Sequence, residues 1–477
     1  MSQEIRNLEP KALWNQFADL NAVPRPSKKE EQVIQFMKDF GNRLGLETFE
    51  DDIRNVIIRK PATPGMENRK PIVLQGHLDM VHQKNNDTVF DFETQGIEMY
   101  VDGDWVRAKG TTLGADNGLG VAAIMAVLES TDIPHPAIEA LFTIDEETGM
   151  TGALNLQGGI LQGQILLNLD TEEDDEIDIG CAGGIDVTAT AEYNEEETPE
   201  GSVGYSITVK GLQGGHSGMD IHKGLGNANK IMNRLLFDGF DNFGLQIASI
   251  AGGSLRNAIP RESVAKVIIA AVYDEAFVFD MQQIVNEIKA EFKTTEPNLE
   301  IVFEKLTEVP AKVMPSIAQF YFVRSMYTAH NGVYRMSADF DNLVETSNNI
   351  AKVIVGEGQL TVQCLTRSSV ESSKMDLANA LRSAFELMGC EVEFSGAYPG
   401  WTPNPKSEIL DVLVGIYEKQ NNAKPNVVAC HAGLECGILG TNYPEMDMIS
   451  FGPTIHGAHS PDERASISSS QKFWKFF

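Results

Sequence analysis

Short apolar runs alternate with longer helical stretches up to residue 185 of the chain. The runs at 55–60, 71–78, 140–144 and 165–169 are compact, apolar and bounded by turn-forming residues, so they are predicted to be β-strands. Two helices are predicted between them, one polar at 28–45 and one fully apolar at 119–130. This alternation indicates an α/β sheet with helices packed on its faces.

Two breaks in composition divide the pattern. Residues 191–202 are acidic without an apolar period, and residues 395–405 are rich in proline and glycine. About 200 residues lie between these breaks, a size typical of one domain, and their own strands and helices predict antiparallel sheets with helices on one side. After 405 the α/β pattern resumes. We therefore expect a two-domain α/β protein in which a domain with a central mixed sheet is interrupted by an inserted α+β domain: 1–188 and 399–477 form the first domain, and 189–398 the second.

Charge and composition limit the partners. The chain has 477 residues with 38 basic and 68 acidic side chains, a formal charge of −30, which argues against nucleic acid or an anionic membrane as partner. The polar N-terminus lacks the pattern of a signal peptide, and no apolar run approaches the roughly 18 residues of a membrane span. Five scattered cysteines are typical of a reduced thiol pool. These features predict a cytoplasmic protein.

Candidate chemistry lies where the apolar runs end. Three of them lead directly to acids or a histidine, namely His77 with Asp79, Glu146 with Glu147, and Asp170. Ligands of open α/β sheets bind outside the carboxyl ends of the strands, so these side chains would line one polar crevice. Such a crevice needs a counter-charge, and a divalent metal would supply it.

His77 and Asp79 stand two positions apart, so both can face the crevice, with Asp79 accepting the second ring N–H of a ligating His77. A strand-end histidine bonded to a neighbouring acid remains the alternative. Asp116 lies in Gly-Ala-Asp-Asn-Gly before the apolar helix, where it is either a metal-bridging carboxylate or ordinary turn and N-cap chemistry. Glu146 and Glu147 can divide the work of proton transfer and metal binding, against the alternative of a solvated acidic loop.

The acids that follow Asp170 are expected to be solvated surface. Near the C-terminus, His459 precedes Ser460-Pro461-Asp462-Glu463, which has the form of a capping box and predicts the start of a helix. His459 would then lie in the preceding loop, with His456 as a competing candidate.

The charges of this set balance. Three carboxylates (Asp116, Glu147, Asp170) and two neutral histidines (His77, His459) match two dications with a bridging hydroxide. Gathered without metal, each close pair of carboxylates would cost several kcal/mol at an effective dielectric constant of about 20. Nitrogen and oxygen ligands without thiolate suit Zn²⁺, Mn²⁺ or Co²⁺ better than Ca²⁺.

With these motifs in order, the chain resembles the two-zinc aminopeptidase and aminoacylase-type metallopeptidases, a family that includes carnosinase and carboxypeptidase G. The resemblance looks close to the aminoacyl-histidine dipeptidase branch and covers essentially the whole chain, including Gly-Gly-His-Ser-Gly around His216, Leu-Arg-Asn-Ala around Asn257 and His-Ala-Gly-Leu-Glu-Cys-Gly at 431–437.

The resemblance implies roles for individual residues. One metal would be held by His77, Asp116 and Asp170, and the other by Asp116, Glu147 and His459; both are expected to be Zn²⁺, replaceable by Co²⁺ or Mn²⁺. By the same resemblance, Glu146 would be the general base, Asp79 the acid behind His77, and His216 a lid histidine that stabilises the oxyanion. Asn257 and Arg367 would hold the substrate carboxylate, and the inserted domain would act as a lid. A homodimer formed through this lid is expected, with a monomer whose lid supplies His216 within the same chain as the alternative. His82 departs from the proline usual in this branch.

The expected activity is hydrolysis of dipeptides of the type Xaa-His, such as β-alanyl-histidine, with Cys-Gly as a further candidate. An N-acyl amino acid amidohydrolase with the same metals is the alternative within the hydrolases. A non-catalytic metal-binding protein is the alternative from another class, although a passive site would not need Glu146 beside Glu147.

Overall fold

The computed structural model describes residues 3–85, 87–340, 342–404 and 406–477. The chain divides into two compact units, which we call unit 1 and unit 2. Unit 1 comprises Met1–Cys181, Trp401–Ala429 and Leu434–Phe477, and unit 2 comprises Ala182–Gly400 and Cys430–Gly433. The α/β fold and the insertion of one unit into the sequence of the other are as the sequence pattern predicts.

Unit 1 is built on a mixed sheet. Within the described ranges the sheet has eight strands in the order β1-β2-β6-β3-β7-β23-β8-β22. The strands are β1 (Glu47–Glu50), β2 (Val56–Lys60), β3 (Ile72–His77), β6 (Ile138–Thr143), β7 (Ile165–Asn168), β8 (Glu176–Cys181), β22 (Asn426–Cys430) and β23 (Asp447–Ser450). The central strands β6, β3, β7 and β23 are parallel to one another, so their carboxyl ends lie at one edge.

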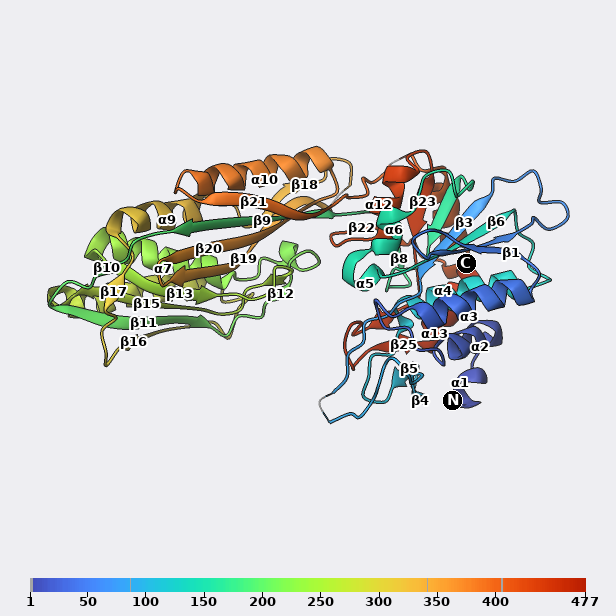
Figure 1. Ribbon diagram of the computed structural model, residues 1–477, viewed down its shortest axis with the longest axis horizontal. Helices are drawn as coiled ribbons and strands as arrows, with labels where there is room; N and C mark the ends of the chain where they lie inside the picture. Colours follow the sequence, from blue (N-terminus) through green and yellow to red (C-terminus); the bar gives the residue numbers. More distant parts are fainter. Residues whose placement is uncertain (1–2, 86, 341, 405) are drawn as a thin grey trace. The chain divides into compact units, whose positions relative to one another are not determined.

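Helices cover this sheet. They are α1 (Gln3–Arg6), α2 (Lys11–Leu20), α3 (Glu31–Arg43), α4 (Ala115–Glu129), α5 (Glu146–Gly149), α6 (Thr151–Asn155), α11 (Glu408–Asn421), α12 (Glu435–Asn442) and α13 (Ile467–Phe476). A second, small sheet has the order β24-β25-β5-β4, with β4 (Met99–Asp102), β5 (Trp105–Ala108), β24 (Ile455–His456) and β25 (Arg464–Ser466). α4 is apolar on all sides because it packs in the interior against β3 and α2. Figure 1 shows the C-terminal elements, in red, returning to the sheet that the N-terminal part begins.

Unit 2 contains an antiparallel sheet with the order β16-β11-β15-β13-β19-β20-β9-β21, and β18 pairs with β19. The strands are β9 (Gly183–Glu192), β11 (Ser202–Lys210), β13 (Gln246–Gly252), β15 (Ser263–Ala270), β16 (Glu300–Lys305), β18 (Gly332–Met336), β19 (Val344–Gly356), β20 (Gln359–Ser368) and β21 (Glu391–Tyr398). Shorter pairs are β10 (Glu196–Glu197) with β17 (Lys312–Val313), and β12 (Gly215–His216) with β14 (Ala258–Ile259).

Four α-helices, as far as unit 2 is described, complete it: α7 (Ala228–Phe243), α8 (Asp274–Glu291), α9 (Ser316–Thr328) and α10 (Glu371–Glu386). They pack against one another and against the sheet around a continuous apolar core. Unit 2 therefore combines an antiparallel sheet with helices.

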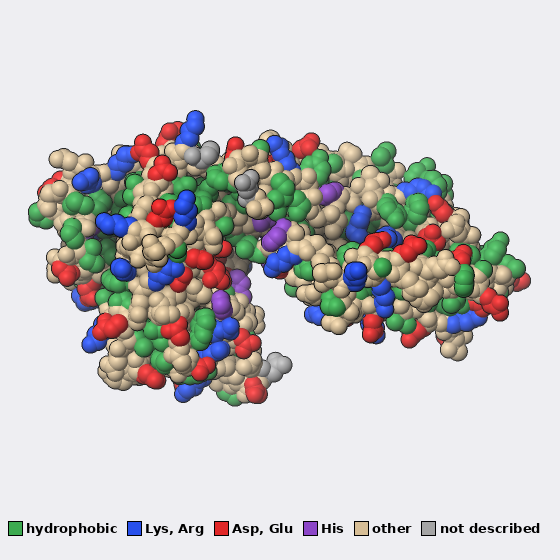
Figure 2. Space-filling view, turned by 180° about the vertical axis from the view of Figure 1, so that it is seen from behind, with side chains coloured by type: hydrophobic (Ala, Val, Ile, Leu, Met, Phe, Trp, Pro, Cys, Tyr) green, Lys and Arg blue, Asp and Glu red, His purple; other side chains and the backbone are tan. Residues whose placement is uncertain are grey.

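None of the helices in the described ranges combines the length and apolar content that a membrane span requires. On the face drawn in Figure 2, Lys and Arg side chains are scattered among Asp and Glu side chains.

Candidate metal centre

The carboxyl edge of the parallel strands gathers the predicted chemistry of unit 1. His77 is the last residue of β3, Glu146 and Glu147 open the short helix that follows β6, and Asp170 lies two residues beyond β7. β3 and β7 are neighbours of one another, and β3 also pairs with β6. The edge predicted from the strand ends is therefore a single place in the structure.

Asp116 lies between the two predicted histidines. Its Oδ1 is 3.1 Å from Nε2 of His77, and its Oδ2 is 3.2 Å from Nε2 of His459. The backbone of Asp116 is not helical (φ −80°, ψ 115°) although it falls in the first turn of α4, and the Asp116–Asn117 peptide bond is cis. Each oxygen of this carboxylate can thus serve a different partner, as a bridging ligand must.

Two groups of three side chains share Asp116. Within each group, one possible metal-ligating atom from each residue lies within 4.8 Å of those of the other two residues. The first group consists of His77, Asp116 and Asp170, and the second of Asp116, Glu147 and His459. In the first group, Oδ1 of Asp170 is 3.5 Å from Nε2 of His77, and in the second, Oε2 of Glu147 is 3.0 Å from Nε2 of His459. The members of these two groups are the same as those of the two ligand sets that the family resemblance implies.

The electrostatics of the two groups fit cations. Hydrogen bonds to Asp116 and Glu147 raise the pKa of His459 to about 11, and although burial opposes it, the charge of Asp170 and bonds to Asp116 raise the pKa of His77 well above its ordinary value. Burial raises the pKa of both Glu147 and Asp170. Burial thus disfavours the ionised form of Glu147 and Asp170, and a cation between these side chains would favour it.

Two orphaned oxygens point to the same conclusion. Oε1 of Glu147 and Oδ1 of Asp170 are buried and have no hydrogen-bond partner in the described part of the chain. Buried carboxylate oxygens without a donor are costly, and a divalent cation would satisfy them. The residues present therefore fit a pair of divalent ions.

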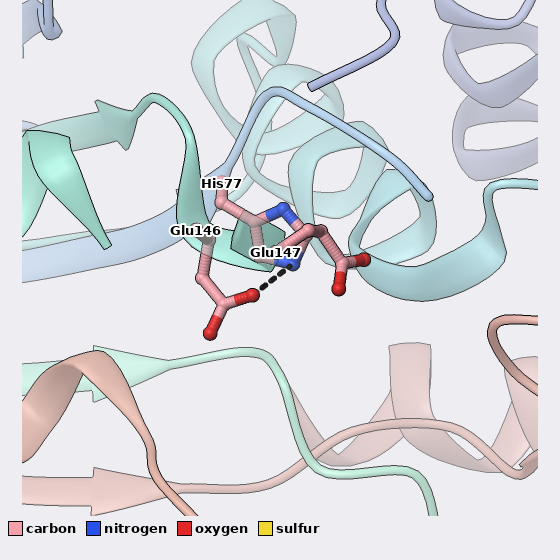
Figure 3. Close-up of side chains that lie close together, drawn as sticks. All are labelled: His77, Glu146 and Glu147. Atoms are coloured by element: carbon pink, nitrogen blue, oxygen red, sulfur yellow. Dashed lines mark ion pairs between the residues drawn. The ribbon is translucent and has the colours of Figure 1, made fainter. Parts of the chain in front are cut away.

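Asp79 connects the first strand to the helix that carries the two glutamates. Its Oδ1 lies 3.4 Å from Nδ1 of His77, and its oxygens accept the amide N–H groups of Glu146 (3.0 Å) and Glu147 (3.3 Å). Figure 3 shows the side chains of Glu146 and Glu147 beside His77, with the Glu146 carboxylate 4.0 Å from Nε2 of the ring. Burial raises the pKa of Glu146 well above its ordinary value.

The structure distinguishes His459 from His456 and shows the surroundings of the acids after Asp170. Nε2 of His456 lies 3.4 Å from Glu173 and its ring packs on Trp105, so His459 rather than His456 joins Asp116. The prediction that the acids after Asp170 are solvated is wrong for Glu172, which is only partly exposed and whose pKa burial raises to about 8.

The helix predicted to begin at Ser460 is absent from the described chain. A turn and the short strand β25 follow instead, and the final helix begins at Ile467 with Ser466 as its N-cap. Glu463 does not complete a capping box in its own segment, because its carboxylate accepts the backbone amides of Leu113, Gly114, Ala115 and Asp116. Glu463 therefore caps the start of α4, which is distant from it in the sequence, and not the start of a helix in its own segment. His82, the departure from the family pattern, packs edge-on against Phe92.

Unit 2 brings the remaining predicted residues together. Nδ1 of His216 accepts the amide N–H groups of Gly218 (3.2 Å) and Met219 (3.1 Å), which leaves Nε2 to carry the proton of the neutral ring. The backbone carbonyl of Asn257 accepts the amide of Ser217, next to His216.

Arg367 is 4% exposed, and its Nη1 donates to the hydroxyl of Tyr398 at 2.7 Å. Nε of Arg367 is buried without a hydrogen-bond partner among the described residues. A buried guanidinium with an unsatisfied N–H group is suited to an anionic group.

His431, which sequence reasoning did not single out, lies in the same neighbourhood. Its Nε2 is 2.7 Å from the hydroxyl of Ser347. Burial, together with the charge of Arg367, lowers the pKa of His431 to about 3, so the ring is neutral. Only its place in the motif at 431–437 could have indicated it.

A cluster of carboxylates and histidines at the carboxyl edge of an α/β sheet, able to hold two divalent ions, is typical of metal-dependent hydrolases. The chain belongs to the peptidase family M20/M25/M40, whose family model matches residues 73–477. It is therefore a hydrolase of the metallopeptidase type.

Individual relatives are similar over the full length. The chain is 44% identical to the cytosol non-specific dipeptidase of Escherichia coli (strain K12) over 475 residues, which is 99% of this chain and 97% of the relative. The crystal structure of aminoacylhistidine dipeptidase from Vibrio alginolyticus matches with a TM-score of 0.92 and 45% identity over 99% of this chain and 96% of that one. The aminopeptidase PepT of Bacillus cereus, 16% identical over 98% and 97%, shares the fold with a TM-score of 0.57.

Proposed function

We propose that this protein is a cytoplasmic dipeptidase that binds two Zn²⁺ ions and prefers dipeptides of the type Xaa-His, such as β-alanyl-histidine. The observation that supports it most is the shared carboxylate of Asp116 between His77 and His459, because a bridging carboxylate is what a two-metal site needs. The names of the two relatives, one a cytosol dipeptidase and one an aminoacylhistidine dipeptidase, support the substrate class and compartment.

In this proposal His77, Asp116 and Asp170 hold one ion, and Asp116, Glu147 and His459 hold the other. When bound, such a pair of ions polarises the peptide carbonyl and lowers the pKa of the attacking water towards about 7.

Glu146 acts as the general base. It takes the proton of the attacking water and passes it to the leaving amine. Its carboxylate is 4.0 Å from Nε2 of His77 and belongs to neither group that shares Asp116, although it forms a further group with His77 and Glu147. We assign it proton transfer because the two groups that share Asp116 already supply three ligands to each ion. Asp79 keeps it in place by accepting its amide N–H, and holds the ring of His77 from behind.

His216, Asn257 and Arg367 act on the substrate. The neutral ring of His216, protonated at Nε2, donates to the oxyanion, and the guanidinium of Arg367 with the amide of Asn257 holds the free carboxylate of the dipeptide. Unit 2 would thereby act as a lid, and we propose that the protein is a homodimer through unit 2, which light scattering on the purified protein tests.

Adjacent glutamates provide the test of the mechanism. Glu146→Gln should retain two ions per chain but lose about 10²–10⁴-fold in kcat, because only proton transfer is removed. Glu147→Gln should instead bind one ion fewer. Metal analysis and kinetics with β-alanyl-histidine, other Xaa-His dipeptides, Cys-Gly and N-acetyl amino acids measure both. Near-normal turnover of Glu146→Gln would remove that residue from the mechanism, and faster hydrolysis of an N-acetyl amino acid would replace the dipeptidase by an amidohydrolase.

A further inference from the structure

One buried carboxylate, that of Glu463, accepts the backbone N–H groups of the segment that carries Asp116. Oε2 of Glu463 accepts the amides of Leu113 (2.7 Å) and Gly114 (3.0 Å), and Oε1 accepts those of Ala115 (2.7 Å) and Asp116 (3.3 Å). Gly114 has a positive φ of 68°, a conformation that suits glycine and lets these consecutive N–H groups converge. Glu463 is 2% exposed, so water does not compete for these bonds.

Arg25 binds a backbone carbonyl oxygen of the same segment. Its Nη2 donates to the carbonyl oxygen of Gly114 at 2.5 Å, and its Nη1 donates to the carbonyl oxygens of Leu78 (3.1 Å) and Asp79 (3.0 Å). Arg25 is 1% exposed. It therefore joins the Asp116 loop to the two residues that directly follow His77.

The two contacts are complementary. Glu463 is four residues beyond His459, so it joins the Asp116 loop to the His459 loop, whereas Arg25 joins it to the His77 loop. Asp116 in turn contacts His77 through Oδ1 and His459 through Oδ2. Each of the two buried side chains thus links the Asp116 segment to the segment that carries one of the histidines.

We propose that Arg25 and Glu463 are positioning residues for the two-ion centre, with Arg25 setting the geometry on the His77 side and Glu463 setting it on the His459 side. This rests on the proposed function, because it assumes that both sides bind a divalent ion. A residue that merely stabilises unit 1 would affect both sides alike, so selectivity for one side distinguishes the two roles.

The test measures Zn²⁺ affinity directly. Metal-free protein is titrated with Zn²⁺ against a chromophoric chelator, in single-site backgrounds that retain one side each. In H77A, which retains the His459 side, Glu463→Gln should weaken Zn²⁺ binding about 10–100-fold, the usual effect of losing a group that orients a ligand. In H459A, which retains the His77 side, Arg25→Lys should weaken binding by a similar factor. The crossed combinations should leave affinity unchanged.

Unit 2 offers a matched control for Glu463. Glu296 is also 2% exposed, and its carboxylate likewise accepts two backbone amides, those of Gln213 (2.7 Å) and Gly226 (2.8 Å). Glu296→Gln makes the same chemical change in unit 2, which contains none of the proposed metal ligands, and should leave Zn²⁺ affinity unchanged. Should Glu463→Gln not fold, the shorter Glu463→Asp, which cannot reach all four amides, is expected to give the same one-sided loss.

Equal weakening of both sides, or no weakening on either, would overturn the inference. Wild-type protein that binds fewer than two ions would instead overturn the proposed function, so the two failures are told apart by the unmodified chain.

Discussion

Gly218 is the position where a single methyl group should uncouple catalysis from metal binding. A Cβ atom placed there would lie 2.0 Å from the carbonyl oxygen of His431, far inside contact distance. His431 cannot give way easily, because its ring is hydrogen-bonded to Ser347 and the preceding carbonyl accepts the amide of Ala182 at 2.9 Å. In Gly218→Ala the loop itself must therefore move by about 1 Å, since a close-packed interior transmits such strain.

The displacement acts on His216. The amides of Gly218 and Met219 are the donors that fix Nδ1 of His216, so shifting them misplaces the Nε2 proton. Loss of one oxyanion donor costs about 10²–10³-fold in kcat, or about 2.7–4 kcal/mol, which sets the upper limit of the effect. Overpacking should also lower the free energy of unfolding of unit 2 by about 1–3 kcal/mol. The two ions should stay bound, because their proposed ligands lie in unit 1.

Steady-state kinetics, metal analysis and urea unfolding on the same preparation measure these effects. Gly415→Ala is the control, since a Cβ there meets nothing within 4 Å in α11; it should keep full activity and gain up to about 1 kcal/mol of stability. His216→Ala provides the reference, and the double variant with Gly218→Ala should be no slower than it, because both act through one ring. Wild-type kcat in Gly218→Ala would refute the reasoning.

Two further predictions concern ions and pH. Exhaustive chelation should abolish activity and lower the melting temperature of unit 1. Zn²⁺ added at 100 times its Kd should restore about 2.7 kcal/mol of the free energy of unfolding per site, as measured by calorimetry. An unchanged melting temperature after chelation would contradict this prediction. Burial keeps His431 neutral when folded, with its pKa lowered to about 3, so stability should fall as pH drops from about 6.5 towards 3. By pH 5 this loss is about 2 kcal/mol in wild type and absent in His431→Gln, as urea unfolding at pH 7 and 5 would reveal; equal losses would contradict it.

The location of the centre could be predicted from local patterns. β3, β6 and β7 are short, buried and parallel, so the residues that follow them had to meet at one edge. His77, Glu147 and Asp170 are found there because a strand's end is visible in sequence. His459 was placed correctly in a loop, although the helix expected after it is not present.

The supporting residues could not be found in this way. Glu463 has the local spacing of a capping box. Its carboxylate nevertheless accepts amides that lie 347 to 350 positions earlier in the chain. Arg25 stands in a segment without any motif, and its role depends on carbonyl oxygens at Leu78, Asp79 and Gly114. Backbone groups carry no sequence signature, so contacts made to them are invisible until the fold is known.

Two buried carboxylates, those of Glu435 and Glu463, support the segments that carry the proposed ligands. Glu435 is fully buried, and its Oε2 accepts from Gln75 on β3 and Thr143 at the end of β6, both at 2.6 Å. Burial raises the pKa of Glu435 and of Glu463 to about 7. Bound dications would favour the ionised form of both acids, and the ionised acids orient the strands and loops that present the ligands. Ion binding and the order of these two carboxylates therefore reinforce each other, which gives a physical reason for an acidic chain to bury carboxylates that take no part in the reaction.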